Sequence, residues 1–166
     1  MKVKSDHRID GCIAVEIACA EIYRSLSERF PEAGALWNEL SGEEKDHAVS
    51  LIMAQGGSPE DDAPDITDHY AMPFIKEALE LVRTIKKRLA SGDITLEDAL
   101  HLSLELEKSA VEGFFWDVFT GENDMQAVAR MKHIIEKEQS HGRKIIGFME
   151  GIGIPHRGFK PEIPGQ

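Results

Sequence analysis

Two motifs of the form Glu-x-x-His, Glu44 with His47 and Glu138 with His141, are the residues in this chain best suited to do chemistry. Residues three or four positions apart share one face of an α-helix, and each motif has apolar residues one turn before and one turn after it. Both motifs are therefore predicted to face a core. Because buried ionisable groups are costly unless they are paired or bind a metal, the pattern indicates a metal site.

A single glutamate upstream of each motif belongs to the same pattern. Glu16 and Glu107 each occupy one position of an otherwise apolar helical stripe, and an aromatic residue follows each of them seven positions later, Tyr23 and Phe114. The two halves of the chain thus repeat the order Glu, aromatic residue, turn, Glu-x-x-His. This repeat predicts that six ionisable side chains meet at one height between four helices.

Four carboxylates and two imidazoles match the ligand set of two-metal sites in helical bundles. The four negative charges would balance two divalent cations, whereas without metal they would repel one another and take up protons. Such ligands suit iron or manganese better than an ion that prefers thiolates. The predicted cofactor is a pair of iron ions, with manganese or a mixed pair as the alternative. The predicted ligands are Glu16, Glu44, His47, Glu107, Glu138 and His141.

Helices with an apolar period of 3.6 residues must position these ligands. Pro31 suits the end of one helix and the first turn of the next, and Thr95 with Asp98 has the form of a capping box. The main helices are predicted at about 9–30, 31–54, 95–119 and 124–149, with an accessory helix at about 74–90. The expected fold class is all-α, an antiparallel four-helix bundle whose long crossover carries the accessory helix.

Length and composition fit one globular domain: the chain has 166 residues, of which 42% are hydrophobic and 30% charged. We expect the bundle to occupy residues 1–150 and an irregular tail to occupy 151–166. The formal charge of −11 argues against a nucleic-acid partner, which needs clustered Lys and Arg. No apolar run is long enough to span a bilayer and no signal peptide is recognised, so a cytoplasmic protein without a membrane partner is expected.

Several residues near the predicted ligands have competing interpretations. Glu105 and Glu43 lie about 200° and about 100° around their helices from the ligand positions, so both are predicted to point away from the site. Glu21 and Glu112 match across the repeat and are either polar flank residues or part of an access path. Tyr23 is the candidate catalytic residue. Three interpretations of it stay open: a core residue, a hydrogen-bond partner of a ligand carboxylate, or an electron relay.

The remaining histidines and the two cysteines are predicted to have no part in the site. Cys12 and Cys19 are too far apart along one helix for a disulfide, so they are expected to be small core residues. The acidic segment 61–69 lacks the Gly and the terminal Glu of an EF-hand loop and is predicted to be solvated. The histidines without a partner at ligand spacing, all predicted to be exposed to solvent, are His7, His69, His101, His133 and His156.

The sequence resembles the rubrerythrin and ferritin-like di-iron superfamily over about residues 9–149. The resemblance rests on Ala-Val-Glu16-Ile-Ala-Cys-Ala-Glu-Ile-Tyr23, Gly-Glu-Glu44-Lys-Asp-His47-Ala, Leu-Glu-Leu-Glu107-Lys-Ser-Ala-Val-Glu-Gly-Phe114 and Glu138-Gln-Ser-His141. It implies a ferritin-like bundle, two irons held by the six ligands above, redox chemistry with oxygen, peroxide or ferrous iron, and a homodimer or larger homo-oligomer. Rubrerythrins proper also carry two Cys-x-x-Cys pairs, which this chain lacks, and peroxidase-type members have an extra Glu where Ala110 stands.

The expected function is that of a di-iron oxidoreductase. It would reduce peroxide or oxygen with electrons from ferrous iron or from a separate donor protein, because the chain has no electron-transfer cysteines of its own. Two other classes stay open, namely a metal-buffering or iron-delivery protein with little turnover and a metal-free helical interaction module. Metal uptake distinguishes the metal-free module from the oxidoreductase and from the metal-buffering protein. Catalytic loss of peroxide then distinguishes the oxidoreductase from the metal-buffering protein.

Overall fold

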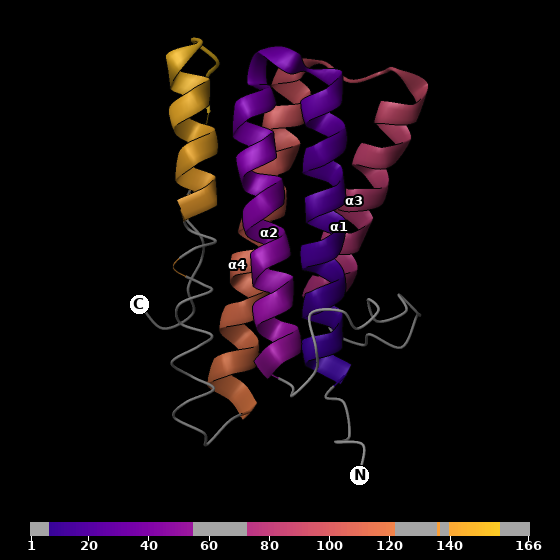
Figure 1. The fold of residues 1–166 in the computed structure, drawn as a ribbon, viewed down its shortest axis with the longest axis vertical. Helices are drawn as coiled ribbons and strands as arrows, with labels where there is room; N and C mark the ends of the chain where they lie inside the picture. The colour runs from indigo at the N-terminus through magenta and orange to yellow at the C-terminus, as the bar shows by residue number, and fades with distance from the viewer. Residues whose placement is uncertain (1–6, 55–72, 122–135, 137–139, 157–166) are drawn as a thin grey trace.

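The computed structural model describes residues 7–54, 73–121, 136 and 140–156 (Figure 1). Over these residues the chain is helical, and no strand occurs among them, which confirms the predicted all-α class. The elements are α1 (His7–Arg29), the 3-10 helix η1 (Pro31–Ala33), α2 (Gly34–Ala54), α3 (Pro73–Ser91), α4 (Leu96–Gly121) and a further helical segment, 140–151. In the part of the chain described, no helix is both long and apolar enough to cross a membrane.

The helices lie side by side with alternating directions (Figure 1). α1 and α2 form an antiparallel pair, α3 packs against both α1 and α4, and the segment 140–151 lies beside α2. The helix predicted at about 74–90 is present as α3, and it contributes to the core through Ile75 and Ile85, which are fully buried.

The chain reverses between α1 and α2 within a few residues, at the proline that the sequence singles out. Phe30 follows the last residue of α1, and its backbone N–H donates to the carbonyl of Leu26. Pro31 then opens η1, where a missing N–H costs nothing. The N–H of Ala33 donates to the carbonyl of Phe30, which closes the turn. This tight connection places the predicted inward faces of α1 and α2 against each other.

The core is built from the helix faces that the apolar periodicity predicts. Tyr23 and Leu26 of α1 and Trp37 and Leu40 of α2 are fully buried, and Leu100 of α4 joins them. Cys12 and Cys19 are buried in α1 as small core side chains, as expected. Burial of these large side chains is the main favourable contribution to folding, at about 1.5–3 kcal/mol each.

The predicted capping box at the start of α4 is formed. The backbone N–H of Asp98 donates to the Thr95 hydroxyl at 3.1 Å, and the Thr95 backbone N–H donates to the Asp98 carboxylate at 3.1 Å. The Thr95 backbone N–H and the Thr95 hydroxyl, which donates to the Asp98 carboxylate at 2.8 Å, hold the pKa of Asp98 below its usual value. The Arg88 guanidinium, 2.8 Å from the same carboxylate, acts in the same direction. Gly92, with a φ of 73°, lets α3 end at Ser91, four positions before Thr95.

Thr95→Ala should lower the free energy of unfolding by about 1 kcal/mol, because it removes the side-chain acceptor at the N-terminus of α4. Urea denaturation followed by circular dichroism measures the change. Thr84→Ala is the matched control, since Thr84 lies exposed within α3 and its hydroxyl donates only to the carbonyl of Glu80. An equal loss in both variants would contradict a specific capping role for Thr95.

The C-terminal helix ends in a hydrogen-bonded capping motif. Gly153 has a φ of 76°, the N–H of Ile154 donates to the carbonyl of Met149 at 2.9 Å, and the N–H of Gly153 donates to the carbonyl of Glu150 at 3.2 Å. This pattern is a Schellman motif. Ile154, just after this motif, packs against the core. The irregular tail expected over 151–166 stays a prediction. Residues 157–166 lie outside the described residues.

Candidate metal centre

The structure brings five of the six predicted ligands together from four helices. Glu16 comes from α1, Glu44 and His47 from α2, Glu107 from α4 and His141 from the segment 140–151. All five side chains are buried. The sixth predicted ligand, Glu138, lies outside the described residues.

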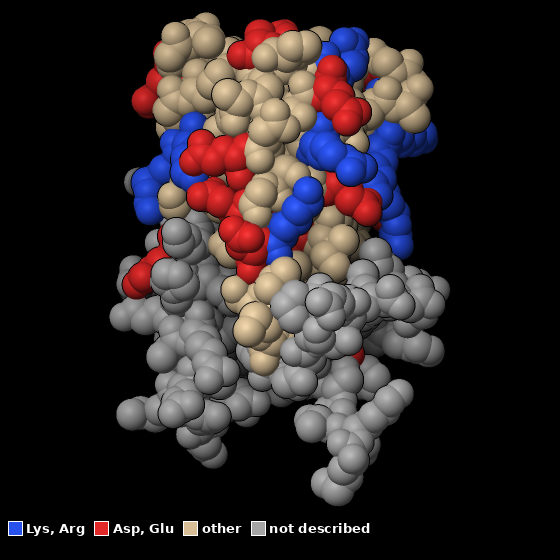
Figure 2. Space-filling model, in the orientation of Figure 1, with Lys and Arg blue, Asp and Glu red and all other residues tan. Residues whose placement is uncertain are grey.

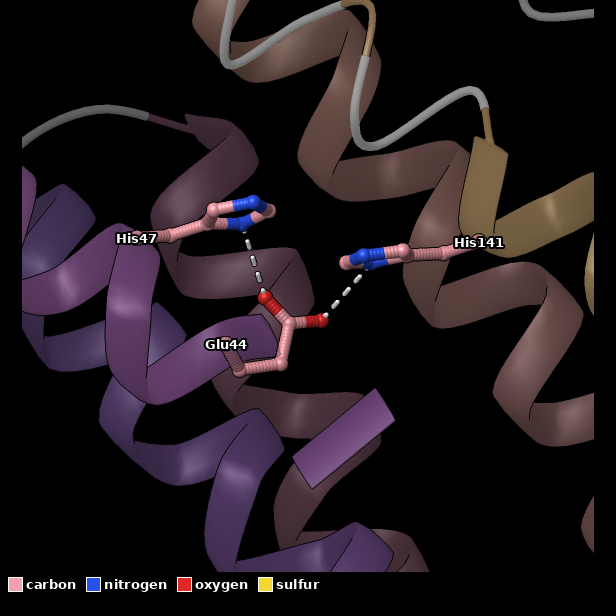
Figure 3. Close-up of side chains that lie close together, drawn as sticks. All are labelled: Glu44, His47 and His141. Carbon is pink, nitrogen blue, oxygen red and sulfur yellow. Dashed lines mark ion pairs between the residues drawn. The ribbon is translucent and has the colours of Figure 1, made fainter. Parts of the chain in front are cut away.

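Glu44 is the centre of this cluster (Figure 3). Its Oε2 atom lies 3.3 Å from Nδ1 of His47, and its Oε1 atom lies 3.3 Å from Nδ1 of His141. The two imidazole rings face each other nearly in parallel, with centroids 5.2 Å apart and an interplanar angle of 11°. One carboxylate thus touches a histidine from its own helix and a histidine nearly a hundred residues away.

Glu16 and Glu107 each add a carboxylate to one side of the cluster. Oε2 of Glu16 lies 3.4 Å from Nδ1 of His47, and Oε2 of Glu107 lies 3.3 Å from Nδ1 of His141. The same nitrogen of each histidine therefore faces two carboxylates. This is the arrangement expected if Nδ1 is the nitrogen that binds metal.

The cluster has the size and chemistry of a cation site. One ligand atom each from Glu44, His47 and His141 lie within 4.8 Å of one another, and all three residues are buried. Because nitrogen and oxygen ligands bind transition metals at about 2.0–2.2 Å, two ligands of one ion stand up to about 4.4 Å apart. The three side chains need only a small contraction to hold a metal ion.

The close approach of these groups shifts the pKa values of Glu44 and His141. Burial alone would raise the pKa of Glu44, but hydrogen bonds from His141, His47 and Glu16 outweigh burial and hold its pKa far below the usual range. Burial would likewise lower the pKa of His141, but Glu107 and Glu44 outweigh it and raise that pKa to about 12. An ion that binds Nδ1 of His141 must therefore displace a proton, so metal uptake is expected to release protons.

Tyr23 supports the cluster from α1. Its side chain is fully buried, and its hydroxyl donates a hydrogen bond to Oε1 of Glu107. Burial and the negative charge of Glu107 raise the pKa of the phenol well above its usual value, which keeps it a neutral donor. Two of the three interpretations of Tyr23, a core residue and a hydrogen-bond partner of a candidate ligand, thus apply together, and a relay of electrons stays a prediction.

Tyr23→Phe should lower the stability of the metal-free protein by about 1.5–3 kcal/mol, because Glu107 loses a donor inside the core. Chemical denaturation in the presence of a chelator measures this loss. The metal content at saturation should not change, since the hydroxyl is not among the candidate ligands. A variant as stable as the wild-type chain would show that Glu107 gains nothing from Tyr23.

Glu43 is the residue near the site whose role the sequence analysis missed. The sequence predicts that Glu43 points away from the site, yet its Oε2 atom lies 3.0 Å from Nε2 of His141. An angular offset on α2 describes only that helix, whereas His141 approaches Glu43 from the neighbouring helix. No pattern along α2 could have revealed this contact, and only the place of Lys144 one turn after His141 hints at an acidic partner.

The other residues considered in the sequence lie at the surface or outside the described side chains. Glu21 is exposed and pairs with Lys86 of α3 at 3.0 Å, which agrees with a polar flank residue. Glu105 is exposed, as predicted. His101 and His156 are half-buried rather than fully exposed, and each lies near a surface glutamate. The structure does not describe the side chains of His7, Ala110, Glu112 and Phe114. It also does not describe His133 or the segment 61–69, which includes His69.

No protein-family model, no curated protein and no solved structure matches the chain. The function must therefore be argued from the site.

Proposed function

We propose that this chain is a ferritin-like di-metal protein. In this proposal the four helices of the bundle are α1, α2, α4 and the C-terminal helix, and α3 is the accessory helix of the long crossover. The antiparallel α1–α2 pair and the position of α3 against α1 and α4 support it. The placement of one candidate ligand or motif on each of these helices also supports it, because ligands are distributed in this way in di-iron carboxylate bundles.

The single observation that carries the proposal is the convergence of Glu16, Glu44, His47, Glu107 and His141 in one buried cluster. Buried carboxylates and imidazoles on four separate helices have no structural reason to gather, because apolar side chains would fill the same volume at lower cost. Glu138 would supply the fourth carboxylate, so that two divalent cations are balanced in charge.

The activity that we propose is reduction of peroxide or oxygen by a di-iron centre, with electrons from ferrous iron or from a separate donor protein. When bound, the two metal ions would polarise a small oxygen substrate and exchange electrons with it. The side chains have separate tasks: Glu44 lies between the two histidines, and Tyr23 holds the carboxylate of Glu107 in place. The buried setting keeps bulk water from competing for the ligands.

Metal analysis beside a peroxide assay tests this proposal. Freshly purified protein should contain iron or manganese. Anaerobic ferrous-loaded protein, with further Fe²⁺ in excess as the electron source, should consume added peroxide over many turnovers with a change in near-ultraviolet absorption. Stoichiometric uptake without catalytic loss of peroxide would instead favour a metal-buffering or iron-delivery protein. Absence of uptake would leave only the helical interaction module. Size-exclusion chromatography with light scattering checks the proposed homodimer or larger assembly.

A further inference from the structure

A chain of charged side chains connects His141 to the surface between two helices. Nε2 of His141 lies 3.0 Å from Oε2 of Glu43, and Nζ of Lys144 lies 2.7 Å from the same oxygen. The Lys144 ammonium also lies 2.7 Å from Oε1 of Glu39. Figure 2 shows acidic side chains gathered over α2 next to basic ones on the side of the C-terminal helix.

The two nitrogens of the His141 ring have different partners. Nδ1 faces Glu44 and Glu107 inside the cluster, whereas Nε2 faces Glu43 at its edge. A neutral imidazole carries one proton, and the hydrogen bond made by one nitrogen decides which lone pair the other can offer. A carboxylate at Nε2 therefore keeps the proton on Nε2. The lone pair of Nδ1 is then available to bind a metal ion in the cluster.

We propose that Glu43 is a positioning residue that accepts a hydrogen bond from Nε2–H of His141 and so fixes the tautomer and the ring orientation in which Nδ1 binds metal. This inference rests on the metal centre proposed above. Histidine ligands commonly donate their second N–H to a carboxylate, and removal of that carboxylate weakens metal binding.

Lys144 holds Glu43 in this position. It lies one turn after His141 on the same helix, and both oxygens of Glu43 are within 2.8 Å of its ammonium group. The lysine and the carboxylate are each only 28% exposed, so the pair is partly shielded from water. Because Lys144 and His141 are fixed to the same helix, the carboxylate is clamped by two donors of fixed spacing.

Zinc uptake by the full chain tests the proposal, since Zn²⁺ is diamagnetic and accepts the same carboxylate and imidazole ligands. Glu43→Ala should weaken Zn²⁺ affinity by about 10- to 100-fold, as measured by chelator competition. Glu39→Ala is the matched control. Glu39 also touches Lys144, but within the described part of the structure it forms no ion pair with His141. The Zn²⁺ affinity of Glu39→Ala should therefore stay near that of the wild-type chain.

Nitrogen-15 NMR of the zinc-loaded protein supplies a readout that a loss of packing would not imitate. His141 should show a protonated Nε2 and a metal-bound Nδ1 in the wild-type chain and in Glu39→Ala. In Glu43→Ala the Nε2 proton should exchange faster with water and its resonance should move upfield. Where Glu43→Ala does not fold by circular dichroism, Glu43→Gln, which keeps the volume but not the charge, should show the same changes to a smaller degree.

The outcomes separate this inference from the proposal beneath it. If the wild-type chain binds no metal, the proposed centre fails and the role of Glu43 with it. If the wild-type chain binds Zn²⁺ but folded Glu43 variants bind it equally tightly with an unchanged His141 spectrum, the metal centre stands and the positioning role is overturned. Metal bound through Nε2 in the wild-type chain would overturn it as well.

Discussion

A variant that combines Glu44→Ala with His141→Ala should lose most of the metal that the wild-type chain takes up. Glu44 touches both histidines of the cluster, and His141 brings the C-terminal helix to it. Removal of both leaves His47 with only the Glu16 carboxylate among the described contacts to its Nδ1 atom. Inductively coupled plasma analysis of the purified proteins, after loading with Fe²⁺ under anaerobic conditions, measures the metal content.

The control for this experiment replaces a glutamate and a histidine on α4 that do not face the site. Glu105 is exposed and His101 is half-buried at the surface, so Glu105→Ala with His101→Ala should leave the metal content as it is in the wild-type chain. Metal should also raise the melting temperature of the wild-type and control proteins, because ligand at 100 times its Kd adds about 2.7 kcal/mol of stability. Unchanged metal content in the Glu44 and His141 variant would refute the centre and favour a metal-free interaction module.

Trp37→Ala should lower the free energy of unfolding by about 3–5 kcal/mol, which is a large part of the total stability of a domain of this size. Trp37 lies in α2 with no exposed surface and packs against Phe30 with ring centroids 5.9 Å apart. Truncation leaves a cavity beside the turn that joins α1 to α2. Urea denaturation of the metal-free protein measures the loss.

Trp37→Phe is the matched variant for this position and should cost clearly less. Phenylalanine keeps an aromatic ring against Phe30, and it removes an indole Nε1–H that is buried without a hydrogen-bond partner in the described part of the structure. A buried donor without an acceptor carries a desolvation penalty, and its removal offsets part of the lost packing. Equal losses for Trp37→Phe and Trp37→Ala would contradict this account.

The sequence alone predicted the helices over 7–54 and 73–121 and the faces that they bury, whereas most of the helix expected at about 124–149 lies outside the described residues. Apolar periodicity placed Glu16, Glu44 and Glu107 on inward stripes, and the structure buries all three. Local chemistry also predicted the capping box at Thr95, because both partners lie within one helical turn of each other. The Schellman motif around Gly153 was not predicted, because it depends on backbone hydrogen bonds that composition does not describe.

Only the tertiary structure decided which groups touch across helices. The hydrogen bond from Tyr23 to Glu107 and the contact of Glu43 with His141 join residues far apart in the chain, and neither follows from the spacing within one helix. Periodicity determines the direction in which a side chain leaves its own helix. The rotation and height of a neighbouring helix depend on how the side chains of the two helices pack against each other. The contact of Glu43 with His141 is therefore determined by helix packing and not by the pattern along α2.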